Sequence, residues 1–113
     1  MIARVWQGIV SAEKAEAYER YLAQSELGVR GYRAIHGNRG ASLLRRVEAG
    51  GVRFLLISLW DSEEAIREYA GADMDRARYF DFDRDCLLDP DPNVSHYEVL
   101  DGNDALMSPR ESR

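Results

Sequence analysis

Apolar and polar positions along the chain recur in two patterns, which predict strands and helices in turn. Residues 2–10 and 52–60 are rich in β-branched and aromatic side chains, which favours strands. Residues 12–27 place apolar side chains three or four positions apart, as an amphipathic helix does. Residues 41–49 are predicted to form another strand, joined to 52–60 by a Gly50-Gly51 hairpin turn.

The second half of the chain continues this order. Residues 61–64, Asp-Ser-Glu-Glu, have the form of a capping box with Asp61 as the cap, so a helix is expected to begin there. Residues 72–91 are acidic and aromatic, and we expect a further helical turn near residues 76–80. Two prolines then precede a last strand over residues 93–100.

The predicted order is strand, helix, strand, strand, helix, strand. This order favours an α+β, ferredoxin-like βαββαβ fold, in which a four-stranded antiparallel sheet carries both helices on one face. Residues 1–100 would form this domain, and residues 101–113, which are polar, are predicted to be a mobile tail. The glycine-rich residues 29–40 are expected to form a loop of the kind that borders functional sites.

The strand over residues 52–60 is apolar on both of its faces. Two helices cover one face of a small sheet, and the other face would then expose a patch that soluble monomers rarely tolerate. The simplest cover is a second copy of the chain, so we predict a homodimer packed sheet against sheet. The alternative is a helix from residues 72–91 that folds over the same face.

Composition narrows the classes of partner. The chain has 113 residues, with 15 basic against 20 acidic side chains and a formal net charge of −5. This balance argues against nucleic acid as a partner and against a polybasic membrane anchor. With the single Cys86, no apolar run long enough to span a membrane and no signal peptide, we predict a cytoplasmic protein.

One acidic segment resembles a calcium-binding loop in its spacing. Asp81, Asp83 and Asp85 alternate with other residues, but Cys86 stands where such a loop needs glycine and Pro92 where it needs glutamate. We therefore expect no metal site and a solvated acidic loop.

Two histidines and two arginines are candidates for acid–base and anion-binding chemistry. His96, within the last strand, and His36, in the glycine-bounded loop, are the histidines that can act as bases. The alternative for His96 is a structural imidazole bonded to a neighbour, and the alternative for His36 is a solvent-exposed loop residue. Arg45 and Arg46 alternate on a strand, so one of them faces inward and can clamp an anion. The alternative for each arginine is an edge-strand charge paired with an acid.

Aromatic side chains can supply flat walls and polar tips to a cavity. Trp6 and Trp60 can offer indole N–H groups to a planar ligand, although tryptophans at strand ends are more often core anchors. Arg4 shares a strand face with Trp6, and an ion pair with Glu98 is the simplest expectation for it. We expect Tyr18, Tyr21, Tyr69 and Tyr79 mainly to pack on helix faces, from which their hydroxyls can point into a space between helix and sheet.

Several short motifs, taken in their order along the chain, resemble one known family. They are Trp6-Gln7-Gly8, Gly31-Tyr32-Arg33, Gly37-Asn38-Arg39-Gly40, Leu44-Arg45-Arg46, the run from Phe54 to Ile66, and His96-Tyr97-Glu98-Val99. Together they resemble the antibiotic biosynthesis monooxygenase family, within the dimeric α/β-barrel superfamily, over about residues 1 to 100.

The resemblance implies a homodimer whose two sheets form a barrel, with a ligand pocket between sheet and helices. It also implies a cofactor-independent monooxygenase that acts on a planar aromatic phenol or quinone precursor, with no cofactor and no metal. In such a reaction a base removes a proton and the electron-rich anion reduces O2. The candidate catalytic residues are His96, Trp60 and Arg45, and the candidate ligand-binding residues are Trp6, Tyr69, Tyr79, His36 and Arg46.

Two other functions share the same fold. The haem-degrading branch of the resemblance implies an asparagine, a tryptophan and a histidine at places that hold approximately Ala3, Tyr69 and Tyr79 here, so haem degradation is disfavoured. A non-catalytic, ligand-binding or stress-related homodimer is the main alternative.

Overall fold

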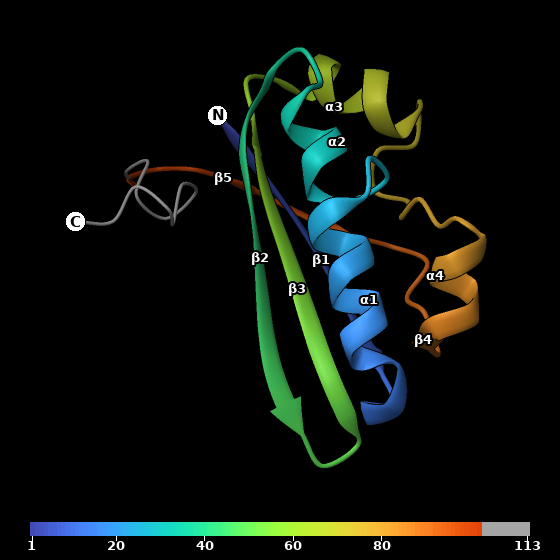
Figure 1. Cartoon of the computed structure of the whole chain (residues 1–113). Coiled ribbons are helices and arrows are strands. Elements are labelled where there is room, and N and C mark those ends of the chain that lie inside the picture. Colours follow the sequence, from blue (N-terminus) through green and yellow to red (C-terminus); the bar gives the residue numbers. More distant parts are fainter. Residues whose placement is uncertain (103–113) are drawn as a thin grey trace.

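The structure is a computed structural model of the chain and describes residues 1–102. It confirms the predicted α+β class (Figure 1). The tail predicted over residues 101–113 lies almost entirely outside the described residues. No helix among residues 1–102 is both long and apolar enough to cross a membrane. The elements are β1 (Ile2–Val10), α1 (Ala12–Gln24), α2 (Val29–Arg33), β2 (Asn38–Glu48), β3 (Gly51–Trp60), α3 (Glu63–Ala70), α4 (Asp81–Cys86), β4 (Leu87–Leu88) and β5 (Ser95–Glu98).

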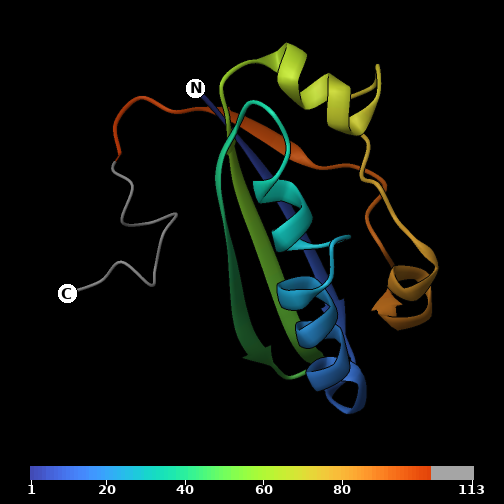
Figure 2. The ribbon, with the colours of Figure 1, turned by 45° about the horizontal axis from the view of Figure 1, so that its top comes forward.

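The strands form one antiparallel sheet in the order β2-β3-β1-β4, with β5 also paired to β1. The helices gather on one face of this sheet, as two views of the ribbon agree (Figures 1 and 2). Strand β3 pairs with β1 along its length, from Ile2 opposite Trp60 to Val10 opposite Val52. The sheet order is that of the predicted ferredoxin-like fold.

The predicted fourth strand is divided into two short strands. Strand β4 pairs with Ile9 and Val10 at one end of β1, and β5 pairs with the other end. Between them, Asp89 has a positive φ of 48°, and Pro90 and Pro92 lack the N–H that a central ladder requires. The predicted strand over residues 93–100 is therefore shorter, and the sheet has five strands rather than four.

Three local predictions differ from the structure. The loop predicted over residues 29–40 contains the short helix α2, and the turn expected near residues 76–80 is instead α4, which begins at Asp81. The hairpin turn is Ala49-Gly50, because Gly51 already pairs with Glu48 in the sheet. Gly51 has φ 143°, and a Cβ on it would lie 2.2 Å from the Val10 carbonyl oxygen, so a glycine is needed beside that turn.

Strand β3 separates the core from an open face of the sheet. Its alternate residues from Val52 to Trp60 are buried beneath the helices, and the residues between them are only half-buried. The helix that could have covered the open face does not, because α4 packs on the helical side, where Asp83 accepts a hydrogen bond from Tyr18 of α1. The apolar residues of this open face are Ala3, Val5, Ile9, Leu44, Leu55, Ile57, Leu59, Leu88 and Tyr97.

The start of α3 corrects the predicted cap. Ser62, not Asp61, caps the helix, since its Oγ accepts a hydrogen bond of 3.2 Å from the backbone N–H of Ala65. Asp61 is held outside the helix because its backbone N–H donates to the Gly37 carbonyl at 2.8 Å, while its exposed carboxylate pairs with Arg39.

This geometry predicts different costs for two neighbouring substitutions. Ser62→Ala should lower the free energy of unfolding by about 1 kcal/mol, because the first turn of α3 loses its side-chain acceptor. Asp61→Ala, the matched control, should cost at most about 0.5 kcal/mol, since it breaks only an exposed ion pair. Urea unfolding at one fixed protein concentration measures both values. A larger loss for Asp61→Ala than for Ser62→Ala would contradict the assignment of the cap.

Candidate functional site

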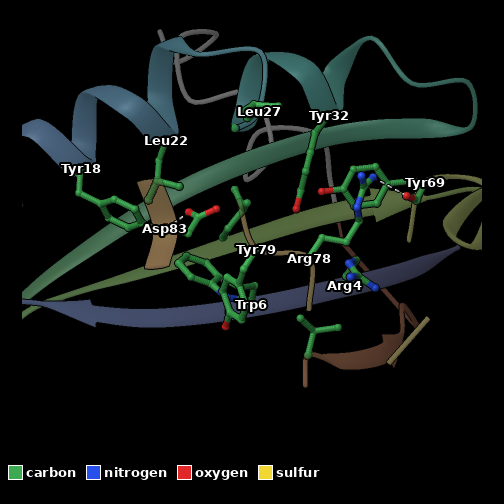
Figure 3. A pocket seen from close by; sticks show the side chains of 13 residues that line it. Arg4, Trp6, Tyr18, Leu22, Leu27, Tyr32, Tyr69, Arg78, Tyr79 and Asp83 are labelled. Carbon is green, nitrogen blue, oxygen red and sulfur yellow. Dashed lines mark hydrogen bonds between the residues drawn. The ribbon is translucent and has the colours of Figure 1, made fainter. Parts of the chain in front are cut away.

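A narrow cavity lies between the helical face of the sheet and the helices (Figure 3). Measured out to its open mouth, its empty volume is about 410 Å³, and the part that the centre of a water-sized sphere can reach is about 30 Å³. That reachable part has room for roughly two water molecules. The lining residues are Arg4, Trp6, Tyr18, Leu22, Leu27, Gly28, Tyr32, Leu56, Tyr69, Arg78, Tyr79, Asp83 and Val94.

Arg4 is the most buried charge at this cavity, with only 3% of its surface exposed. Its guanidinium donates to the backbone carbonyls of Met74 and Arg76, the latter at 3.2 Å, and to Nε2 of His96 at 3.0 Å. Among residues 1–102 it forms no ion pair. The expected pair with Glu98 is wrong, because the register of β5 sets Arg4 opposite His96 and moves Glu98 two residues along the strand.

The Arg4 guanidinium is the first member of a hydrogen-bonded chain that continues through His96 to Asp75. A guanidinium can only donate, so Nε2 of His96 must be the acceptor, and the ring proton must sit on Nδ1, which lies 3.1 Å from an Asp75 oxygen. Burial and the neighbouring Arg4 charge lower the pKa of His96 below its usual value, against the opposing effect of Asp75. The imidazole is therefore held neutral and positions Arg4.

Phenol rings and a second arginine surround the same end of the cavity. Tyr32 and Tyr69 lie 4.8 Å apart between ring centres, and the Arg4 guanidinium lies 5.8 Å from the centre of the Tyr69 ring. Arg78 stacks 5.0 Å from that ring and donates to the Tyr69 carbonyl at 2.7 Å. Burial raises the pKa of Tyr32 and Tyr69, so their hydroxyls stay protonated and can donate hydrogen bonds.

The opposite end of the cavity carries a buried carboxylate (Figure 3). Asp83 is 6% exposed and accepts hydrogen bonds from the Tyr18 hydroxyl at 2.7 Å and the Tyr21 hydroxyl at 3.2 Å. The expectation of a solvated acidic loop is therefore wrong for Asp83, because α4 turns this residue toward α1. Within residues 1–102, no group of three or more potential metal ligands lies close enough to hold a metal ion.

An indole and a phenol form the middle of the cavity. The Trp6 indole N–H donates to the Tyr79 hydroxyl at 3.0 Å, and that hydroxyl donates to the Asp91 carbonyl at 2.6 Å. Burial raises the pKa of Tyr79, so it stays neutral. Tyr79 and Arg78 lie on residues 71–80, which form no helix or strand.

The structure brings some of the candidate site residues to the cavity and leaves others away from it. Trp6, Tyr69 and Tyr79 line the wall, and His96 lies one contact behind it, on Arg4. Trp60 is fully buried behind Tyr69, with ring centres 5.8 Å apart and its indole N–H bonded to Ser58.

Three further candidates do not line this cavity. Arg45 lies near the outer end of β2 and forms an ion pair of 2.5 Å with Glu19. Arg46 points to the open face and pairs with Glu48. His36 is exposed in the turn between α2 and β2. Both arginines are thus paired with an acid, which was the alternative to an anion-clamping role for them.

Sequence reasoning missed Arg4, Tyr32, Arg78 and Asp83 as site residues, and it named Tyr18 only as a packing residue whose hydroxyl can reach the cavity. For Arg4 a signal existed, since it shares with Trp6 a face of β1 that is otherwise apolar. For Asp83 and Arg78 there was none, because their positions depend on how residues 71–86 fold back over the helical side.

The support of Arg4 by a neutral His96 predicts a pH dependence. Because the folded-state pKa of His96 is depressed, its neutral form stabilises the fold above pH 6.5, and this contribution is lost as pH falls from 6.5 through the folded pKa. NMR titration should give His96 a midpoint below 6.5, and urea unfolding should show less acid destabilisation in His96→Gln than in the wild type. A midpoint at or above 6.5, or equal pH dependence in both proteins, would contradict this account.

Comparison with known proteins bears on the fold. No protein-family model and no curated protein matches the chain. A solved structure of a proposed antibiotic biosynthesis monooxygenase from Deinococcus radiodurans matches with a TM-score of 0.67 at 17% identity, over 91% of this chain and 96% of that one. The haem degrader MhuD of Mycobacterium tuberculosis, with two haems in its active site, matches with a TM-score of 0.62 at 19% identity, over 91% and 99% of the two chains. A proposed antibiotic biosynthesis monooxygenase from Bacillus cereus matches with a TM-score of 0.57 at 16% identity, over 90% and 95%. The chain therefore has the ferredoxin-like fold of antibiotic biosynthesis monooxygenase structures, and the predicted resemblance is confirmed for the fold.

Proposed function

We propose that the cavity binds a planar aromatic phenol as its anion, and that the protein oxygenates this anion with O2 without a cofactor. The observation that carries the proposal is the buried Arg4 guanidinium, whose contacts among the described residues are to neutral groups. A buried cation without an ionic partner is costly, and an anionic ligand would offset that cost.

The residues around Arg4 favour ionisation of a bound phenol. An adjacent cation lowers the pKa of a phenol, and Arg78 adds a second positive charge at the same end of the cavity. The hydroxyls of Tyr32 and Tyr69 are hydrogen-bonded to each other, and the one proton that this bond leaves can stabilise the anionic oxygen further. Burial opposes ionisation, as it does for Tyr32 and Tyr69, so the proposal requires that the Arg4 and Arg78 charges outweigh burial for the bound phenol.

The ionised ligand would supply the electrons for the reaction. For an anthrone-type substrate, the ring carbon of a CH2 group becomes a carbonyl, and O2 contributes one oxygen atom to it while the other leaves as water. The four electrons released at this carbon are those that reduce O2. The part of the protein is to stabilise the anion and to exclude water, for which a narrow aromatic-lined cavity is suited.

Ligand entry requires a rearrangement at the mouth of the cavity. A cavity of roughly 150 Å³ accommodates benzene, whereas the reachable part of this one is about 30 Å³. Tyr79 and Arg78 are the side chains best placed to move, because they lie on residues 71–80, outside any helix or strand.

A second candidate function is binding without catalysis. It is favoured by the absence of a free imidazole: no histidine is among the described residues that line the cavity, and Nε2 of His96 accepts from Arg4. The same lining offers no cysteine or methionine as a haem ligand, and burial keeps its tyrosines protonated, so a haem-binding role is less favoured.

We also propose that the protein is a homodimer that packs open face against open face. Leu44, Leu88 and Tyr97 on this face are 41%, 45% and 60% exposed, and no described residue covers them. Burying such aliphatic side chains contributes roughly 1.5–3 kcal/mol each. Two sheets that face each other would bury the half-exposed residues of β3 as well.

Oxygen uptake tests the proposed reaction. With an anthrone or hydroquinone, the wild type should consume O2, and Arg4→Gln should lower kcat/KM about 100-fold, because the anion loses its principal donor. Arg20→Gln, a matched loss of an exposed arginine on α1, should retain the rate of the wild type. Tight ligand binding without O2 uptake would favour the non-catalytic function, and equal rates in Arg4→Gln and the wild type would contradict the role of Arg4.

Light scattering tests the dimer. The wild type should have the mass of two chains at micromolar concentration, and Ile57→Glu should be monomeric because it places a charge on the open face. Val47→Glu is the matched control, since Val47 is 75% exposed on the helical side of β2, and it should remain dimeric. A monomeric wild type would refute the proposal.

A further inference from the structure

The end of the cavity remote from Arg4 contains a carboxylate that the proposed reaction does not use. Asp83 lines the wall beside Tyr18, and Figure 3 shows these two residues at one end of the cavity with Arg4 and Arg78 at the other. The cavity is therefore polar at both ends and aromatic in the middle, where Trp6 lies.

The hydrogen bonds to Asp83 do not use all of its acceptor positions. An ionised carboxylate offers about four lone-pair positions, two on each oxygen. Oδ2 accepts from the Tyr21 hydroxyl at 3.2 Å and from the backbone N–H of Phe80 at 2.8 Å. Oδ1 accepts only from the Tyr18 hydroxyl, at 2.7 Å, among the residues that the structure describes. One acceptor position on Oδ1 is therefore left at the cavity.

The carboxylate also lacks a cationic partner within residues 1–102. The nearby basic side chains bind elsewhere, since Lys14 donates to the Asp85 carbonyl and Arg84 pairs with Asp81. A carboxylate that is 6% exposed and held only by neutral donors is costly to bury. A ligand that donates a further hydrogen bond to Asp83 would reduce this cost.

We propose that Asp83 forms a second ligand subsite, which accepts a hydrogen bond from a hydroxyl at the end of the ligand remote from Arg4. The inference rests on the proposed function in assuming that the cavity binds an aromatic anion. It narrows the ligand class to aromatic diols, with an ionised oxygen at Arg4 and a hydroxyl at Asp83. A hydroxyl suits the subsite better than an ammonium group, because it brings one donor for the one vacant position, whereas an ammonium brings three.

A pair of ligands that differ in one methyl group tests the subsite. In 2,6-dihydroxynaphthalene both ends carry a hydroxyl, and in 6-methoxy-2-naphthol one end cannot donate. Titration followed by calorimetry should show that the wild type binds the diol about tenfold more tightly than the ether, as a hydrogen bond to a charged group provides. Equal affinities would overturn the subsite.

Two variants separate the subsite from a structural role of Asp83. Asp83→Asn leaves a single acceptor oxygen for which Tyr18, Tyr21 and Phe80 compete, so the preference for the diol should fall below about threefold. Tyr21→Phe removes a donor to Oδ2 but leaves the vacant position on Oδ1, so it should keep the tenfold preference. Loss of the preference in Tyr21→Phe, or its retention in Asp83→Asn, would contradict the proposal.

These titrations, together with the oxygen-uptake measurement, distinguish failure of the subsite from failure of the proposed function. If both ligands bind equally and Arg4→Gln weakens both, the anion site stands and the Asp83 subsite is wrong. If the diol preference depends on Asp83 but no O2 is consumed, the subsite stands and the oxygenation is wrong. If neither ligand binds the wild type, both proposals are overturned.

Discussion

The burial of one guanidinium is the constraint on which the rest of the site depends. Arg4 points from the middle of the sheet into the helical side, where its charge must be satisfied without water. The backbone carbonyls of Met74 and Arg76, the His96 imidazole and the Tyr32 hydroxyl accept its hydrogen bonds. The same contacts hold β5 and the segment after α3 against β1. The Arg4 side chain therefore positions part of the cavity wall and also supplies its positive charge.

Because these contacts are neutral, the cavity keeps a net attraction for an anion at one end. The tyrosines nearby remain protonated through burial and add donors rather than charges. At the other end Asp83 provides an acceptor, and Trp6 lies between the two ends as a flat wall. The polarity of the cavity thus follows from two buried charges of opposite sign that do not neutralise each other.

The sheet and its helical face could be predicted from sequence, because the alternation in residues 52–60 and the order of the elements depend on local pattern. The environment of Arg4 could not be predicted, since it depends on the register of β5, which sets His96 opposite Arg4. Asp83 looked solvated because its neighbours in sequence are acidic, and only the packing of α4 against α1 buries it. Trp60 fitted a site role by residue type, but the pairing of β3 places it in the core.

The most direct test of the account is the affinity of the wild type for a series of phenols of similar size but different acidity, measured by calorimetry at neutral pH. If the unpaired charge of Arg4 governs binding, affinity should rise steadily from phenols that stay protonated to those that are ionised, and this trend should flatten in Arg4→Gln. Affinities that follow ring size and are independent of acidity, or an undiminished trend in Arg4→Gln, would contradict the central claim.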